Sequence, residues 1–235
     1  MSNRPVDEAV RAVAEFLVAD VPLRTTLDRV AEAACVAIEP ARAVGITLTD
    51  EHGPPATEVF TDQVSPDVDQ GQYEEGAGPC LDALRHGAVV RVEDTRETSA
   101  MWPRFARDAE AAGVRSTLSM PMAAAGETFG GLNLYAAQPR AFADDHEADA
   151  ALFTTQASVV LANARAYWAA ADLADGLRQA MATRAVIEQA KGKLMASSGA
   201  TADEAFQMLV SASQRENVKL RDVARRIVEG ERPSA

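Results

Sequence analysis

The C-terminal part of the chain holds three segments with helical spacing: RAVIEQAKGKLM (residues 184–195), TADEAFQMLVSAS (201–213) and KLRDVARRIVEG (219–230). All three lysines of the chain lie in this stretch, where eight Lys and Arg stand against six Asp and Glu. Its net charge of +2, set against −12 for the whole chain and zero for residues 231–235, leaves −14 for residues 1–183. A small basic helical module beside an acidic body indicates a polyanion-binding part and a part that does not touch the polyanion.

Each of the three segments carries an apolar stripe on one face. The second opens with a capping box, Thr201-x-x-Glu204, and Gly199 and Gly230 end the first and third segments. We therefore predict a C-terminal three-helix bundle. Its expected inward-facing residues are Val186, Ile187, Ala190, Leu194, Met195, Ala205, Phe206, Leu209, Val210, Leu220, Val223, Ala224, Ile227 and Val228.

The composition is that of an ordinary globular protein of one or two domains. The 235 residues are 47% hydrophobic and 25% charged, and no apolar run is long enough to span a membrane. The N-terminus lacks the apolar segment of a signal peptide, so we expect a cytoplasmic protein. Two cysteines and three scattered histidines indicate neither a disulfide framework nor a metal site.

The first 140 residues alternate helical and strand patterns, which predicts an α+β fold with an antiparallel sheet and flanking helices. A half-buried strand is expected at 43–50 because Val44, Ile46 and Leu48 alternate with small or polar residues. The polar, Gly- and Pro-containing segment 65–78 is interpreted as a surface loop. The other expected elements are helices at 23–38, 79–86 and 102–112, strands at 57–64 and 88–92, and a hairpin of strands 114–122 and 128–135.

From Asp144 the pattern becomes helical over a long span. Apolar residues recur at spacings of four and three: Phe153, Ala157, Val160, Ala164, Tyr167, Ala171 and Ala174. This coiled-coil-like repeat is typical of a helix that packs on a partner helix, or of one that packs on the sheet of its own domain. Over 153–164 we weigh the two interpretations equally. Beyond Tyr167 we favour a homodimer seam. Gly176 is interpreted as an interruption of this linking helix and a candidate hinge.

The polar faces of the C-terminal helices are basic. The candidates for contact with a polyanion are Arg184, Lys191, Lys193, Lys219, Arg221 and Arg225, with Gln189 and Ala190 as lesser candidates. No aromatic residue is expected among them, so recognition would use phosphate contacts, arginine stacking and shape. A merely solvated face is the alternative. Binding of DNA through a recognition helix at 220–230 is another.

The combination of Arg184, Ile187, the Ala190-Lys191-Gly192 run and Leu194-Met195 with the later helices resembles the ANTAR domain over residues 173–230. The resemblance implies an RNA-binding module of transcription antiterminators. Such a module binds paired small-loop RNA hairpins that overlap a terminator, and so prevents the terminator stem from forming. The basic residues named above are carried over by position as RNA contacts.

Residues 7–165 resemble a GAF domain. The similarity lies in Gly78-Pro79-Cys80-Leu81, Trp102-Pro103-x-Phe105, Arg115–Pro121 and the GGLNLY run at 130–135. It implies a small-molecule or chromophore pocket between the sheet and its covering loops. The ligand and any cofactor are not specified, and the signature of cyclic-nucleotide binders is absent. GAF followed by ANTAR is an arrangement of bacterial regulators.

The residues thus predict a sensor domain over 1–165, a linking and dimerisation helix over 144–183 and an RNA-binding domain over 173–235, with no enzymatic activity. Cys80 has two interpretations. At a helix start it is a reactive thiol, and otherwise it is a small buried apolar residue. The first would suit an alternative function, a ligand or redox sensor that acts through a protein partner.

Overall fold

The computed structural model describes residues 4–15, 21–49 and 55–230. The chain divides into two compact units, residues 1–168 and 169–235, and the boundary falls inside one helix, α6 (Asp144–Ser198). The first unit contains an antiparallel sheet with the strand order β2-β1-β5-β4-β3. The strands are β1 (Ala43–Leu48), β2 (Ala56–Phe60), β3 (Val90–Val92), β4 (Ser116–Ala124) and β5 (Glu127–Ala136). The predicted α+β class is confirmed.

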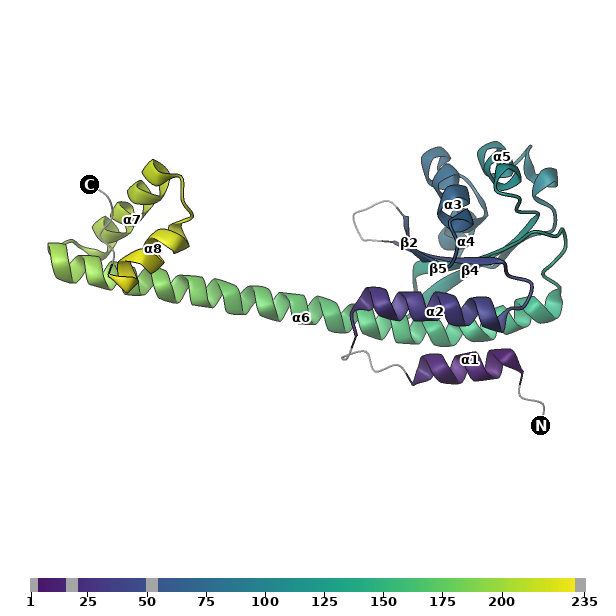
Figure 1. Ribbon diagram of the computed structural model, residues 1–235, viewed down its shortest axis with the longest axis horizontal. Coiled ribbons are helices and arrows are strands. Elements are labelled where there is room, and N and C mark those ends of the chain that lie inside the picture. Colours follow the sequence, from purple (N-terminus) through teal and green to yellow (C-terminus); the bar gives the residue numbers. More distant parts are fainter. Residues whose placement is uncertain (1–3, 16–20, 50–54, 231–235) are drawn as a thin grey trace. The chain divides into compact units, whose positions relative to one another are not determined.

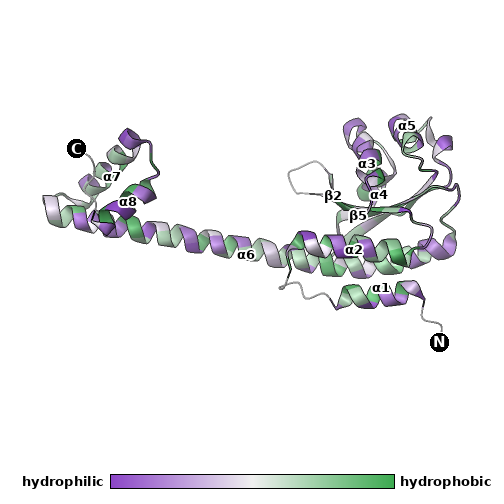
Figure 2. Ribbon diagram, in the orientation of Figure 1, coloured by the Kyte–Doolittle hydropathy of each residue, from purple (hydrophilic) through white to green (hydrophobic). Residues whose placement is uncertain are grey.

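Helices cover both faces of this sheet (Figure 1). One face packs against α2 (Leu23–Ala37) and the beginning of α6, and the core between them includes Val30, Ile46 and Phe153. α1 (Pro5–Ala14) packs on the outer side of α2, away from the sheet. α2 carries both apolar and polar residues in Figure 2, as a helix between core and solvent does. The other face carries α3 (Val64–Glu75), α4 (Pro79–His86) and α5 (Pro103–Ala111), and the 3-10 helix η2 (Thr95–Thr98) precedes α5.

The predicted hairpin is confirmed by β4 and β5, which pair along their whole length. The turn consists of Ala125 and Gly126, whose φ angles are 53° and 86°. Two central residues with positive φ are typical of the turn that matches the right-handed twist of a hairpin.

Strand β1 is buried on both faces, so its prediction as a half-buried strand is wrong. Val44 and Ile46 lie in the core beneath α2 and α6, whereas Gly45 and Thr47 are covered from the side of α3. Gly45 lies so close to α3 that a Cβ there would be 3.1 Å from the Cβ of Ser65. Asp50 and residues 51–54 lie outside the described part of the chain.

The segment predicted as a surface loop, 65–78, is mostly the helix α3. Its buried face contains Ser65, Asp69 and Gln72 beside Val64 and Val68. Polar side chains therefore occupy positions that an amphipathic pattern assigns to apolar ones, and the helical periodicity disappears from the sequence. Gly76, with φ 70°, ends the helix in the left-handed conformation.

The predicted interruption at Gly176 is also wrong, because α6 continues through it as a 55-residue helix. Of the predicted seam, Phe153, Ala157 and Ala164 are fully buried within the first unit. The interpretation that this part of the helix packs on its own domain therefore holds for 153–164.

In the second unit the end of α6 packs with α7 (Ala202–Glu216) and α8 (Leu220–Glu229) (Figure 1). The predicted three-helix bundle is present, but its first helix is the end of α6 rather than a separate segment. The predicted capping box is formed, since Thr201 Oγ1 accepts from the Glu204 amide and the Glu204 carboxylate accepts from the Thr201 amide at 2.8 Å.

Candidate nucleic-acid interface and a buried polar network

The core of the second unit fixes the orientation of its basic side chains. Ala190, Leu194, Leu209, Val223 and Ile227 are among its buried members. Ala190 is fully buried and so has no side-chain surface for RNA, which corrects its place among the predicted contacts. Met195 was expected in this core but is 38% exposed, so that expectation is wrong as well.

Four of the predicted contact residues keep exposed or half-buried guanidinium or ammonium groups. Arg184 is exposed on α6, Lys219 precedes α8, and Arg221 and Arg225 lie on α8. Arg221 and Arg225 share a single carboxylate, Asp222, at 3.7 and 3.6 Å. One negative charge placed against two positive charges leaves this part of α8 positive. Within the described part of the chain, Arg184 has no carboxylate within ion-pair distance.

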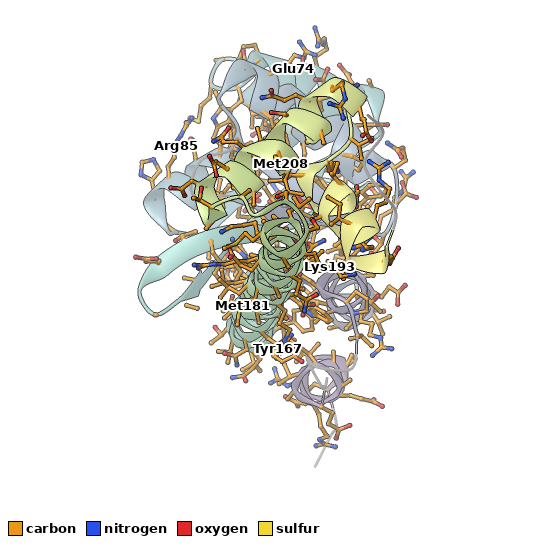
Figure 3. The ribbon with its side chains drawn as sticks, turned by 90° about the vertical axis from the view of Figure 1, so that its left-hand side faces the viewer. Glu74, Arg85, Tyr167, Met181, Lys193 and Met208 are labelled. Atoms are coloured by element: carbon orange, nitrogen blue, oxygen red, sulfur yellow. The ribbon has the colours of Figure 1, made fainter. Side chains whose placement is uncertain are left out.

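The two remaining lysines are held by neighbours. Lys191 Nζ lies 3.0 Å from both carboxylate oxygens of Glu188, one turn earlier on α6. Lys193 Nζ donates to the carbonyl oxygen of Val228 at 2.5 Å and so satisfies the C-terminal end of α8 (Figure 3). Lys193 therefore has a structural partner. Gln189, the residue after Glu188, is exposed.

A groove of about 530 Å³ lies between the three helices of the second unit. Arg184 and Arg221 line it from α6 and α8, and Phe206 lines it from α7. Phe206, expected in the core, is 37% exposed instead. The expectation that no aromatic residue lies among the basic ones is therefore wrong, because the fold brings Phe206 to the same groove as Arg184 and Arg221. The sequence pattern missed this because Phe206 adjoins Ala205, which is the buried residue of that pair.

In the first unit the polar face of α3 forms a closed hydrogen-bonded network with the sheet. Asp69 accepts from Thr57 Oγ1 at 2.8 Å, from Gln72 Nε2 at 3.0 Å and from the Tyr135 hydroxyl. The Tyr73 hydroxyl lies 2.8 Å from the hydroxyl oxygens of both Thr47 and Thr57. The face on which a GAF-type pocket was expected is therefore bridged by direct contacts between α3 and the strands β1, β2 and β5.

The network shifts the acidity of its members. Burial raises the pKa of Asp69 to about 6, although the hydrogen bonds from Tyr135 and Thr57 oppose this. Burial, together with the nearby Asp69 carboxylate, raises the pKa of Tyr73 and Tyr135 above their ordinary range. The two phenols therefore stay protonated while Asp69 titrates.

Cys80 belongs to the same network, at the start of α4. Its sulfur lies 3.1 Å from Asn133 Nδ2 and 3.6 Å from Thr47 Oγ1, and its amide donates to Gln72 Oε1 at 2.9 Å. Burial, with the Asp69 charge, raises the pKa of the Cys80 thiol to about 12. Thiolate character is what makes a cysteine reactive, so the geometry favours the buried structural interpretation of Cys80.

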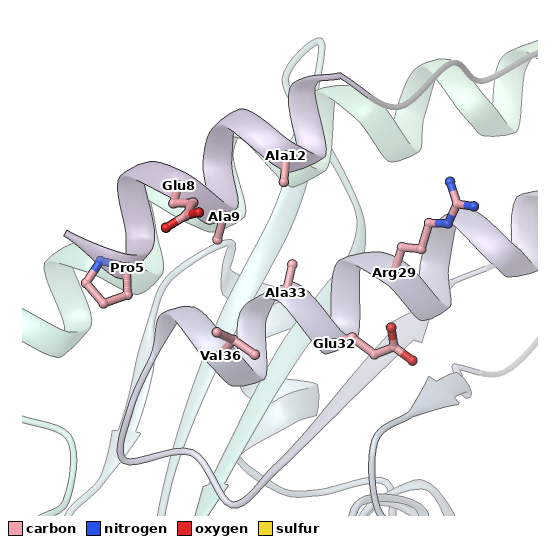
Figure 4. A pocket seen from close by; sticks show the side chains of 8 residues that line it. All are labelled: Pro5, Glu8, Ala9, Ala12, Arg29, Glu32, Ala33 and Val36. Atoms are coloured by element: carbon pink, nitrogen blue, oxygen red, sulfur yellow. The ribbon is translucent and has the colours of Figure 1, made fainter. Parts of the chain in front are cut away.

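A second groove, of about 560 Å³, lies between α1 and α2 (Figure 4). Small apolar side chains face each other across it, Ala9 and Ala12 from α1 and Ala33 from α2, and the charged Glu8 and Arg29 also line it. In the described residues we find no cluster of three or more His, Cys, Asp or Glu side chains suited to a metal ion. No described helix is long and apolar enough to cross a membrane.

Comparisons with known proteins divide the chain in the same order as the sequence predicts. A GAF domain family model matches residues 20–162, and an ANTAR domain family model matches residues 175–228. No curated protein matches the chain.

Solved structures of GAF domains have the same fold. The GAF domain of an Acinetobacter phosphoenolpyruvate-protein phosphotransferase is 18% identical, with a TM-score of 0.54, and the match covers 71% of this chain and 97% of that one. The free methionine-R-sulfoxide reductase from Neisseria meningitidis, in complex with its substrate, is 18% identical with a TM-score of 0.55, covering 71% and 95%. The phycoerythrobilin-bound GAF domain of a cyanobacterial phytochrome is 12% identical with a TM-score of 0.53, covering 69% and 96%.

These likenesses concern the fold alone, since proteins with quite different activities share it. The family models show more than the fold, because one matches within each compact unit and each assigns a domain family. The chain belongs to the GAF domain family, and an ANTAR domain follows its GAF domain.

Proposed function

We propose that the chain is a cytoplasmic transcription regulator whose ANTAR domain binds small-loop RNA hairpins and thereby prevents termination. The observation that carries the proposal is the placement of Arg184 on α6 and Arg221 on α8 at one groove. The ANTAR match over this unit supports an RNA-binding output. Lys219 and Arg225 extend the positive surface along α8, and Gln189, Lys191 and Lys193 remain secondary candidates. No catalytic step is part of the proposal.

The acidic part of the chain before the C-terminal basic segments, residues 1–183, bears on how RNA is bound. With −14 on residues 1–183, long-range attraction of a polyanion is opposed, and contact must be local. Screening at cellular salt limits that repulsion to roughly 8 Å. Binding then depends on a few guanidinium–phosphate contacts and on the fit of the RNA, which suits recognition of a folded hairpin more than indiscriminate binding.

The GAF domain is the proposed sensor. Its input is an unidentified small molecule, and α6 would transmit the signal by changing the geometry of a homodimer. Leu173, Leu177 and Met181 on α6 support the dimer, because these three large apolar side chains are exposed at four-residue spacing. A dimer would place two ANTAR domains against two hairpins of one transcript.

The test is a fluorescence-anisotropy titration at physiological salt. The full chain is first used to enrich binders from a pool of tandem-hairpin RNAs with randomised small loops. The best binder is then compared with a duplex DNA of equal length. We expect selective RNA binding and an affinity reduced about tenfold or more by Arg221→Ala, because a charge-assisted hydrogen bond is lost.

Arg178→Ala is the matched control. Arg178 is an exposed arginine on α6 that pairs with Asp175 at 2.6 Å and does not line the groove. It should leave the affinity within about twofold and keep the salt dependence, whereas Arg221→Ala should reduce the salt slope by about one. If both variants lose the same amount of RNA affinity, the loss reflects the net charge of the domain and not a contact at the groove. Stronger binding to duplex DNA would overturn the proposal in favour of a DNA regulator.

A further inference from the structure

The groove of the second unit combines arginines, which suit a phosphate, with an aromatic ring and polar side chains, which phosphate binding alone does not require. It contains an aromatic ring, Phe206, arginines from two helices, and polar side chains at its wall, Gln179 and Thr183. All of its lining residues belong to the second unit, so the groove is a property of the ANTAR domain itself.

Phe206 is the aromatic member of the set. In α7, Ala205 and Leu209 are fully buried, whereas Phe206 is 37% and Met208 43% exposed, and of these two only Phe206 lines the groove. A partly exposed aromatic ring forgoes hydrophobic stabilisation that a core position would give. It also presents a flat apolar face, on which any nucleobase can stack.

The charges around the ring favour an anionic occupant. Arg184 and Arg221 line the groove beside Phe206, and the one carboxylate among the lining residues, Glu188, has both of its oxygens within 3.0 Å of Lys191 Nζ. The ion pair removes most of the repulsion that Glu188 would exert on a phosphate. Asp222 lies 3.7 Å from Arg221, whereas Arg184 has no carboxylate within ion-pair distance in the described part of the chain, so Arg184 carries most of the free positive charge at the groove.

From this arrangement we infer that the groove receives one unpaired base of the hairpin loop. The base stacks on Phe206, its polar edge meets Gln179 or Thr183, and its flanking phosphates contact Arg184 and Arg221. Unpaired loop bases are the part of an RNA hairpin whose edges and faces are free for such contacts. The inference rests on the proposed RNA binding and assigns a base-reading residue to it.

The test couples a protein variant to a change in the RNA. Phe206→Leu keeps an apolar side chain but removes the aromatic face. The RNA is the enriched tandem hairpin, prepared with an abasic nucleotide at each loop position in turn. For the intact RNA, Phe206→Leu should weaken binding about 5- to 150-fold, the range of one base–aromatic stack. At one loop position, the abasic RNA should bind the wild type about as weakly as intact RNA binds Phe206→Leu. The affinity of Phe206→Leu should be the same for this abasic RNA as for the intact RNA.

Two further variants separate stacking from stability. Phe206→Tyr retains the ring and should restore most of the affinity. Met208→Leu changes another partly exposed apolar side chain of α7 that does not line the groove, and it should bind as the wild type does. Thermal unfolding of Phe206→Leu should stay close to that of the wild type, because the ring is already partly exposed.

The outcomes distinguish this inference from the function on which it rests. If the wild type enriches no RNA from the pool, both are overturned. If it binds RNA and Phe206→Leu binds equally well, the base pocket is overturned and the RNA-binding function stands. If Phe206→Leu weakens the binding of every abasic RNA by the same factor, the base pocket is also overturned. Phe206 would then affect RNA binding through the folding of the domain or through contact with a second copy.

Discussion

Asp69 is a carboxylate buried in the interior of the GAF domain. It is fully buried, and its carboxylate is held by Thr57, Gln72 and Tyr135, three neutral donors from β2, α3 and β5. None of them carries a positive charge to compensate the carboxylate. Burial therefore dominates over hydrogen bonding, and the pKa rises to about 6 instead of falling.

This raised pKa predicts the direction of a pH effect on stability. Between the unfolded value of 3.8 and about 6, the folded chain holds the Asp69 proton more firmly than the unfolded chain does. The contribution of Asp69 to the free energy of unfolding should therefore decrease as the pH rises through this window, by about 3 kcal/mol in total. Urea unfolding of wild type and Asp69→Asn from pH 4 to pH 7 measures it, because the asparagine removes this titration.

Asp67→Asn is the control on the same helix, since Asp67 is exposed and, among the described residues, accepts a side-chain hydrogen bond from Gln63 alone. Its curve of stability against pH should run parallel to that of the wild type. The curve of Asp69→Asn should diverge from the wild-type curve across the window. Parallel curves for all three proteins would mean that Asp69 is as solvated in the folded chain as in the unfolded one.

At the scale of elements, the junction of α3 and α4 leaves no room for a side chain at Gly78. Gly78 has φ 156°, and a Cβ there would lie 2.2 Å from Gln72 Oε1 and 2.5 Å from its Cγ. Gln72 cannot move freely, because it accepts from the Cys80 amide and donates to Asp69. We predict that Gly78→Ala lowers the free energy of unfolding by about 3 kcal/mol through steric overlap and the broken network.

Gly76→Ala makes a matched comparison at the end of α3. Gly76 also has a positive φ, 70°, but a Cβ there meets nothing within 4 Å. Only the backbone cost of about 1–2 kcal/mol applies. Chemical unfolding of both variants should rank Gly78→Ala as the less stable. The reverse order would show that the contact with Gln72 yields easily.

The same junction explains what the sequence could predict and what it could not. α2, α4, α5 and the β4–β5 hairpin were predictable because their apolar spacing, prolines and turn residues agree. α3 was not, since its buried face holds Ser65, Asp69 and Gln72, whose partners on distant strands satisfy them. Likewise the basic residues could be named from sequence, but their groove with Phe206 depends on how three helices pack.

At the scale of the whole molecule, α6 raises the question of what covers its second half. One face of its first half is buried in the GAF domain, whereas Leu173, Leu177 and Met181 are 66%, 57% and 73% exposed. Figure 3 shows Met181 on the side of α6 turned away from α7 and α8. Burial of each such side chain contributes about 1.5–3 kcal/mol. A seam through these three residues would replace the predicted one through Ala171 and Ala174, because large apolar side chains bury more surface than alanines do.

We therefore predict that Leu177→Gln with Met181→Gln converts a dimer of the full chain to a monomer, since glutamine keeps helix propensity and removes the apolar surface. Sedimentation equilibrium measures the mass, with Met208→Gln on α7 as the control that stays dimeric. Affinity for a single hairpin should be unchanged, while affinity for the tandem hairpin should fall at least tenfold, because the second contact no longer benefits from linkage. A wild type that sediments as a monomer both alone and on the tandem RNA would contradict the dimer, and the two hairpins would then bind independently.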